Sequence, residues 1–237
     1  FYKYLTVSTK QITENPVKDI EFPKIRKSLP KYLTLEESTA LLRAVDGSNQ
    51  TRDFAILMLF LNCGIRRSEL VGLNLTDVYD DRIRVVGKGS KERIVYMGTA
   101  CREAIDRYMV ERRQIVLSDN RALFGSRDKN RISVSAVHRL VKKHLLEAGL
   151  DATQFSAHKL RHTAATLMYQ EGHVDMLALK EILGHAHVST TEIYTHMGTA
   201  QLRQAAQASP FAKLDFEKAP EQPVKAAALP KHSDDEL

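Results

Sequence analysis

The chain has 237 residues, 43% of them hydrophobic, which is enough for one large domain or two small ones with an ordinary core. Its 35 basic and 29 acidic residues give a formal charge of +6, which suits a polyanionic partner, although a solvated basic surface is the simpler interpretation. Only two cysteines occur and no stretch reaches the ~18 apolar residues that span a bilayer, so composition excludes a disulfide-rich scaffold and membrane-spanning helices and favours a reducing cytoplasm.

The N-terminal part predicts a helix end followed by a linker. Residues 1–10 have the pattern of the last turns of a helix, and the chain starts mid-pattern without Met, so we expect a fragment of a longer protein. Residues 15–32 are punctuated by proline and predict an extended interdomain linker. Such a strap could lie along a phosphate backbone, and a plain solvated linker is the alternative. Its candidate DNA-contacting cations are Lys24, Arg26, Lys27 and Lys31.

The main domain is predicted to begin with helices. Thr34, with Glu37 three residues later, predicts a capping box at the start of a helix over 35–47. The run 52–62 is apolar almost all round, which indicates a buried helix. Gly64 then separates this helix from a short one over 68–73.

The rest of the body predicts one β-hairpin and further helices. Segments 83–86 and 93–96 are rich in β-formers and are joined by a turn whose glycines permit positive φ and whose tip carries lysines. Further helices are predicted over 99–116, 133–148, 158–171, 175–183, from about 190, and over 200–207. The tail 211–237 has few large apolar residues and is expected to be disordered, with Phe211 and Leu214 as an anchor. The predicted fold is mainly α with a small antiparallel sheet, of the α+β class.

A group of residues suited to phosphoryl transfer lies near the end of the body. Helical spacing of three places His158 and Arg161 on one face. His185 ends the next predicted helix, and Tyr194 follows nine residues later, so that they could converge with the first pair. Phosphoryl transfer requires guanidiniums that bind the nonbridging oxygens, a nucleophile, and groups that donate or accept protons.

Each of these residues taken singly has another interpretation. A lone histidine is more often structural, and a lone tyrosine is more often a core or surface aromatic. His158 and His162, four residues apart, could also be a zinc pair. The pattern His-Glu-x-x-His would need Glu at position 159, where Lys stands, and the sequence shows no further obvious ligand.

Four stretches of the sequence, taken in chain order, match the motifs of one protein family. They are Cys63-Gly64-Ile65-Arg66-Arg67-Ser68-Glu69-Leu70, Val86-Gly87-Lys88-Gly89-Ser90-Lys91-Glu92-Arg93, His158-Lys159-Leu160-Arg161-His162-Thr163, and Leu183-Gly184-His185 with Ser189-Thr190-Thr191-Glu192-Ile193-Tyr194-Thr195-His196. Together they resemble the tyrosine recombinase family, also called the phage integrase family, and most closely its Xer-like branch. The resemblance covers about residues 1–210 and implies the catalytic-domain fold of that family.

The resemblance implies a division of labour at the scissile phosphate. Arg66 and Arg161 would hold the phosphate and stabilise charge on its oxygens, with Glu69 orienting Arg66. Tyr194 would attack the phosphorus and form a 3′-phosphotyrosyl link. That link stores the energy of the phosphodiester, so strand exchange would need neither metal nor ATP, and no cofactor is expected.

The remaining roles concern protons. Lys88 would be the general acid for the leaving 5′ oxygen, an assignment that depends on the alignment of the box because Lys91 is a second lysine on the same hairpin. His158 would accept or relay the tyrosine proton, and His185 would hydrogen-bond a nonbridging oxygen. Further DNA contacts are expected from Arg67, Lys91, Arg93 and Lys159.

The resemblance also implies a domain order and partners. Residues 1–14 would end a truncated N-terminal DNA-clamping domain, 15–32 would be the linker, 33–210 the catalytic domain, and 211–237 a tail that is disordered or docks on a neighbouring protomer. The partner would be double-stranded DNA with a recombination site. The protein would be a monomer in free solution and would form a homo- or hetero-tetramer on the DNA, in the cytoplasm on the nucleoid. A catalytically silent DNA-binding clamp of the same fold and a tyrosine-using topoisomerase are the alternatives.

Overall fold

A computed structural model describes residues 1–18, 31–184 and 199–212, and for Lys3, Lys88 and Thr199 it describes the backbone alone. The chain divides into two units, Phe1–Pro30 and Lys31–Leu237, and each is treated by itself. In the first unit, α1 (Tyr2–Val7) ends where the N–H groups of Ser8 and Thr9 both donate to the carbonyl of Tyr4. The helix is therefore shorter than the turns predicted over 1–10. Lys24, Arg26 and Lys27 lie outside the described residues.

The second unit begins with the predicted capping box. Thr34 Oγ1 accepts from the N–H of Glu37 (3.1 Å), and Glu37 Oε2 accepts from the N–H of Thr34 (2.8 Å), which satisfies two of the free donors at the start of α2 (Leu35–Arg43). The start of this helix is confirmed. Its end comes at Arg43, before the predicted stop at 47.

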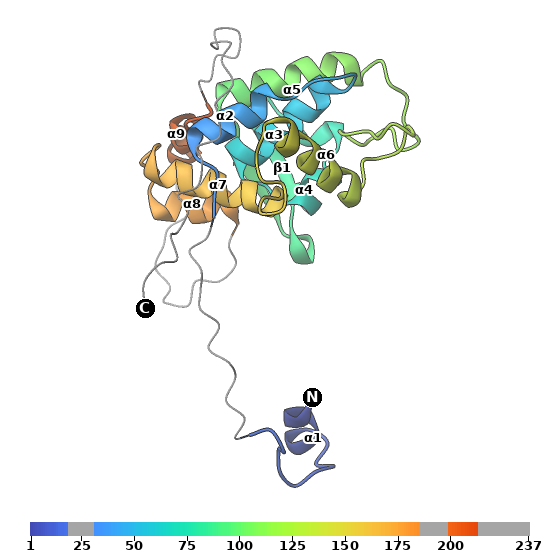
Figure 1. Ribbon diagram of the computed structural model, residues 1–237, viewed down its shortest axis with the longest axis vertical. Helices are drawn as coiled ribbons and strands as arrows, with labels where there is room; N and C mark the ends of the chain where they lie inside the picture. The colour runs from blue at the N-terminus through green and yellow to red at the C-terminus, as the bar shows by residue number, and fades with distance from the viewer. Residues whose placement is uncertain (19–30, 185–198, 213–237) are drawn as a thin grey trace, which may run out of the picture. The chain divides into compact units, whose positions relative to one another are not determined.

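A buried helix, α3 (Gln50–Cys63), forms the centre of the second unit. Its residues from Ala55 to Leu61 are fully buried, as the all-round apolar pattern predicted. The helix lies between α5 (Thr99–Arg112) and α7 (Ala157–Gln170) (Figure 1). Further helices of this unit are α4 (Arg67–Gly72), α6 (Val134–Glu147) and α8 (Met176–Leu183), and a 3-10 turn covers Leu75–Asp77.

The predicted hairpin is present as two antiparallel strands, β1 (Arg82–Val86) and β2 (Glu92–Tyr96). The turn between them contains a short 3-10 segment, Lys88–Ser90, in which Gly89 has φ of +75°. Gly87 is extended, so Gly89 alone of the two turn glycines uses the conformational freedom predicted for them. In the part of the chain that the structure describes, a mostly helical fold with one two-stranded antiparallel sheet confirms the predicted fold class.

The last described element, α9 (Thr199–Ala208), lies beside α8 (Figure 1). It also packs on β2. After it, Phe211 is fully buried and the carbonyl of Ala212 accepts from the N–H of Ala100 (2.9 Å). The anchor predicted at Phe211 is confirmed, so the tail's first two residues are docked on the chain's own body. Leu214 and the helix predicted from about 190 lie outside the described residues, and none of the described helices is long and apolar enough to cross a membrane.

Candidate active site

Arg66 stands where the buried helix α3 gives way to α4. Gly64 ends α3 in the left-handed region with φ of +58°. Arg66 follows in an extended conformation as the N-cap of α4. Its backbone N–H donates to Oε2 of Glu69 (2.7 Å), and its Nη1 donates to Oε1 (2.8 Å). The two residues, one helical turn apart, are therefore in direct contact.

Replacing Gly64 with alanine is expected to lower the free energy of unfolding by about 2–4 kcal/mol, because a left-handed backbone and a steric contact combine there. A Cβ at Gly64 would lie 2.7 Å from Cδ2 of Leu183. Gly149 is a matched control, since it has φ of +72° and nothing within 4 Å of the added atom, so its alanine variant should lose only about 1 kcal/mol. Urea unfolding measures both, and equal losses would show that Leu183 moves aside freely.

Glu69 is held by two arginines. Its side chain is 1% exposed, and Arg93 donates to both carboxylate oxygens, from Nη1 to Oε1 (2.6 Å) and from Nη2 to Oε2 (3.0 Å). Burial alone would raise the pKa of Glu69, but hydrogen bonds from Arg93 and from the Arg66 backbone, with the charge of Arg93, outweigh it and lower the pKa to about 2. The carboxylate is therefore ionised throughout the neutral range.

The depressed pKa of Glu69 makes stability depend on pH. Because the folded pKa of about 2 lies below the ordinary value of 4.5, the stabilisation is complete above about pH 4.5 and is lost as pH falls toward 2. Up to roughly 3 kcal/mol is involved. Urea unfolding at pH 7 and pH 3 should show a gap between wild type and Glu69→Gln that narrows at the lower pH. Glu103→Gln, at an exposed acid on α5, is the control, and a gap that stays constant would contradict the expectation.

Arg161 is fixed between two helix ends. It is 6% exposed, and it donates from Nη1 to the carbonyl of Gly64 (2.5 Å) and from Nη2 to the carbonyl of Leu183 (2.6 Å). Both carbonyls are among those that a helix leaves unpaired at its C-terminus. Burial, and then repulsion from Arg66, lowers the pKa of Arg161 to about 10, so the guanidinium stays charged at neutral pH.

Three of the predicted catalytic residues meet at one pocket. Arg66, His158 and Arg161 all line a pocket of about 420 Å³, together with Arg67 and His138. His158 and the two arginines therefore lie along the wall of one pocket. Such a pocket offers donors and positive charge to an anion, which is the requirement for binding a phosphate.

The alternative zinc pair can also be located. His158 and His162 approach each other with their Nε2 atoms 3.0 Å apart, a geometry in which one of the two nitrogens carries the shared proton. Within the described ranges, no group of three or more His, Cys, Asp or Glu side chains is placed to hold a metal ion.

The other predicted site residues are placed only in part. Lys88 lies in the hairpin turn, but its side chain is not described, and His185 and Tyr194 lie outside the described residues. Among the expected DNA contacts, Arg67, Lys31 and Lys91 are exposed, and Lys159 is half-buried. Their roles remain predictions.

Arg93 was expected to contact DNA, yet its guanidinium is engaged inside the protein, and its side chain is 16% exposed. The strand register gives the reason. Arg93 lies opposite Val85, and its strand neighbour on the same face is Val95, both of which are buried. The sequence of β2 gives no such signal, because its apolar residues Ile94, Val95 and Tyr96 fall on both faces of the strand.

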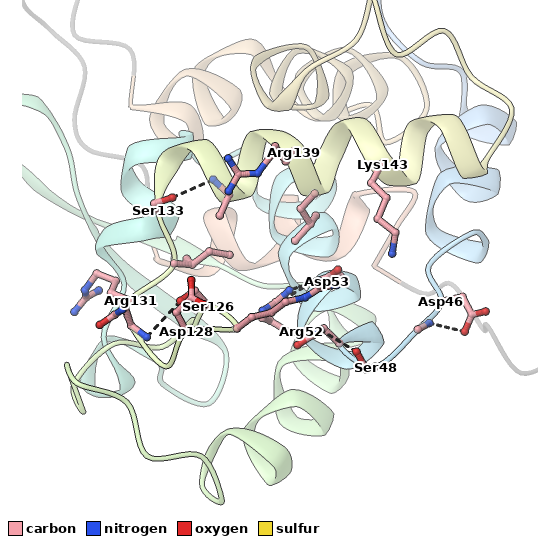
Figure 2. Close-up of a pocket in the computed structure, with 17 residues that line it drawn as sticks. Asp46, Ser48, Arg52, Asp53, Ser126, Asp128, Arg131, Ser133, Arg139 and Lys143 are labelled. Atoms are coloured by element: carbon pink, nitrogen blue, oxygen red, sulfur yellow. Dashed lines mark hydrogen bonds and ion pairs between the residues drawn. The ribbon is translucent and has the colours of Figure 1, made fainter.

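A larger pocket, of about 730 Å³, lies on another face of α6 (Figure 2). Arg139 and Lys143 extend from α6, with Arg52 and Asp53 opposite them (Figure 2). Arg52 is already bound by Asp53 and by the carbonyl of Gly125 (2.9 Å). None of the predicted site residues that the structure describes lines this pocket, so it is not the candidate active site.

Comparison with known proteins points to one family. The model of the phage integrase family matches residues 31–201. The tyrosine recombinase XerC of Caldanaerobacter subterraneus subsp. tengcongensis is 50% identical over 213 residues, which are 90% of this chain and 60% of that protein. The crystal structure of the XerA recombinase has a TM-score of 0.62 at 29% identity, covering 86% of this chain and 78% of that one. A pre-cleavage complex of the XerH site-specific recombinase bound to difH substrate has a TM-score of 0.59 at 27% identity, covering 68% and 48%.

The extent of these matches decides what they establish. This chain spans 60% of the length of the XerC relative. The family model covers residues 31–201, which is most of the chain and includes every predicted catalytic residue. The chain therefore belongs to the phage integrase family of tyrosine recombinases and is Xer-like within it.

Proposed function

We propose that this chain is the catalytic part of a site-specific recombinase that cuts and rejoins double-stranded DNA through a 3′-phosphotyrosyl intermediate. The observation that carries the proposal is the pocket that gathers Arg66, His158 and Arg161. The tyrosine recombinase that is 50% identical over 90% of the chain supports the proposal. The likeness to XerH, whose complex contains its difH substrate, also supports it.

Arg66 and Arg161 bind the nonbridging oxygens of the scissile phosphate, where charge develops in the transition state. Their contacts with Glu69 and with backbone carbonyls hold the guanidiniums in place before DNA binds, so little reorganisation is needed during the reaction. Arg161 stays cationic because its pKa of about 10 lies far above neutrality. His185 adds a hydrogen bond to a nonbridging oxygen.

Cleavage then requires two proton transfers. The phenol oxygen of Tyr194 forms a bond to phosphorus and gives its proton to His158, while the bond to the 5′ oxygen breaks and that oxygen takes a proton from Lys88. A 5′ hydroxyl from another strand reverses these steps and releases the tyrosine. The number of phosphoester bonds is unchanged, so neither ATP nor a metal ion is needed.

The same proposal includes the domain order and the assembly. Residues 1–14 end an N-terminal DNA-clamping domain, 15–32 are the linker, 33–210 are catalytic, and 211–237 form the tail. Recombination of two duplexes requires four protomers, which assemble on DNA in the cytoplasm, at the nucleoid, from monomers. Phe211 is buried on its own body, so docking of the tail on a neighbouring protomer is assigned to the residues that follow Ala212.

The test is formation of a covalent adduct. The probe is a nicked duplex isolated from a random-sequence pool by binding to the full chain, and the adduct is sought on a denaturing gel with a chelator present. We expect a protein–DNA band whose DNA keeps a free 5′ hydroxyl. Tight binding without an adduct would favour the silent clamp. Relaxation of plasmids without any preferred sequence would favour a topoisomerase.

A further inference from the structure

Arg93 connects three parts of the candidate active site. From β2 it donates to both oxygens of Glu69, at 2.6 and 3.0 Å, and its Nε donates to the carbonyl of Ile182 near the end of α8 (3.2 Å). The side chain is 16% exposed. A bidentate contact of this kind fixes the plane of a carboxylate as well as its position.

The fixed carboxylate in turn defines where Arg66 can lie. Glu69 Oε1 accepts from Arg93 Nη1 (2.6 Å) and from Arg66 Nη1 (2.8 Å), so one oxygen is shared by two guanidiniums. Without Arg93, Glu69 would keep its contacts with Arg66, from the N–H to Oε2 and from Nη1 to Oε1, but the two side chains could shift together. Arg93 thereby limits the freedom of a residue that lines the active-site pocket.

The end of α8 is held in the same way. Three successive carbonyl oxygens accept from three different arginines: Ile182 from Arg93 (3.2 Å), Leu183 from Arg161 (2.6 Å) and Gly184 from Arg66 (2.9 Å). These carbonyls lie at the negative end of the helix, where cations are favoured. The chain continues from there to His185 and Tyr194.

Gly184 and Gly87 show how closely Arg93 and Glu69 are surrounded. Gly184 has φ of +62°, and a Cβ there would lie 2.9 Å from both Cδ and Nε of Arg93. A Cβ at Gly87, at the base of the hairpin turn, would lie 3.5 Å from Oε1 of Glu69. The hairpin, α4 and the end of α8 therefore meet around one ion pair.

We infer that Arg93 is a positioning residue for the recombination reaction. It holds Glu69, and through Glu69 the guanidinium of Arg66, in a fixed position relative to the end of α8. The inference rests on the proposed function and deepens it. Arg93 acts through other residues and does not itself touch the phosphate. This role replaces the DNA contact expected from its charge.

The test compares variants of the full chain on the nicked duplex selected from a random-sequence pool. Arg93→Gln should cleave about 100-fold more slowly than wild type while binding the DNA with nearly the same Kd, because a small displacement of a catalytic group has that size of effect on rate. Arg93→Lys should also be slow, since an ammonium cannot make the bidentate contact. Arg84→Gln is the matched control: Arg84 lies on β1 of the same hairpin and pairs with Asp77 (2.7 Å). Its cleavage rate should match that of wild type.

Two further measurements separate positioning from a general loss of structure. Arg93→Gln combined with Glu69→Gln should be no slower than the slower single variant, since both act through one contact. Loss of Arg93 removes hydrogen bonds and charge that lower the Glu69 pKa, so the acid limb of the cleavage profile should shift to higher pH. A merely structural role would leave that limb in place.

A second substrate tests the competing explanation that Arg93→Gln only disturbs the hairpin turn and Lys88 within it. When sulfur replaces the 5′ bridging oxygen, the leaving group needs no proton, so a defect in the general acid disappears. The defect of Arg93→Gln should persist on this duplex, and full recovery would overturn the inference.

The outcomes also separate this inference from the proposed function. Wild type that forms no adduct would remove the proposed function and the inference with it. If wild type cleaves and both Arg93→Gln and Arg93→Lys cleave as fast as wild type, the inference alone is removed. If Arg93→Gln does not fold, Arg93→Lys, which keeps the charge, decides the question by its cleavage rate per folded molecule.

Discussion

Replacing Tyr194 with phenylalanine is expected to abolish the covalent protein–DNA adduct while leaving DNA binding nearly unchanged. The substitution removes the only oxygen that could bond to phosphorus in the proposed step, so the rate should fall by more than ~10⁴-fold. The aromatic ring remains, so packing changes little. The measurement is the yield of adduct on a denaturing gel, beside a gel-shift titration of the same nicked duplex.

The control for this experiment is Tyr169→Phe. Tyr169 is a tyrosine on α7 that is 51% exposed, so its hydroxyl can be removed with little effect on the fold. This variant should form as much adduct as wild type. An adduct that survives in Tyr194→Phe would mean that another residue is the nucleophile, and the assignment of Tyr194 by its box would be wrong.

Local signals in the sequence predicted the helix starts better than the helix ends. The capping box of Thr34 and Glu37 placed the start of α2, because it depends on contacts within one turn. The helix predicted over 99–116 ends at Arg112 instead. Arg112 is 3% exposed and donates to the carbonyls of Ile115 (2.7 Å) and Ala122 (2.8 Å), which holds the following loop against the helix. Local pattern cannot show such a contact with the folded loop.

The same distinction applies to the candidate site. The spacing of Arg66 and Glu69 indicated their contact, since both lie within one helical turn. The position of Arg93 depends on strand pairing and on the approach of α8, which bring together residues 24 and 89 positions apart in the chain. A charged residue in a basic protein is assigned to the surface by composition, and only the packed structure shows that its guanidinium is engaged.

Arg161→Lys is expected to lower the cleavage rate by about 10²–10³-fold, with a much smaller change in DNA affinity. Arg161 already donates to the carbonyls of Gly64 and Leu183, and a guanidinium has five N–H donors, so others remain for the phosphate. A lysine has three donors on one atom and cannot span both carbonyls and a phosphate oxygen. Single-turnover cleavage of the nicked duplex measures the rate.

The variant will also lose stability, and a matched control separates that loss from the chemistry. Arg112→Lys alters another buried arginine whose guanidinium binds backbone carbonyls, but Arg112 does not line the active-site pocket. Both variants should unfold at a lower urea concentration than wild type. The free energy of unfolding should fall by about 1–3 kcal/mol, because carbonyls that lose their donors become unsatisfied. Arg112→Lys should then cleave at the rate of wild type per folded molecule. If the two variants cleaved equally slowly, the effect of Arg161 would be on folding, and Arg66 would be left as the only described guanidinium assigned to the phosphate.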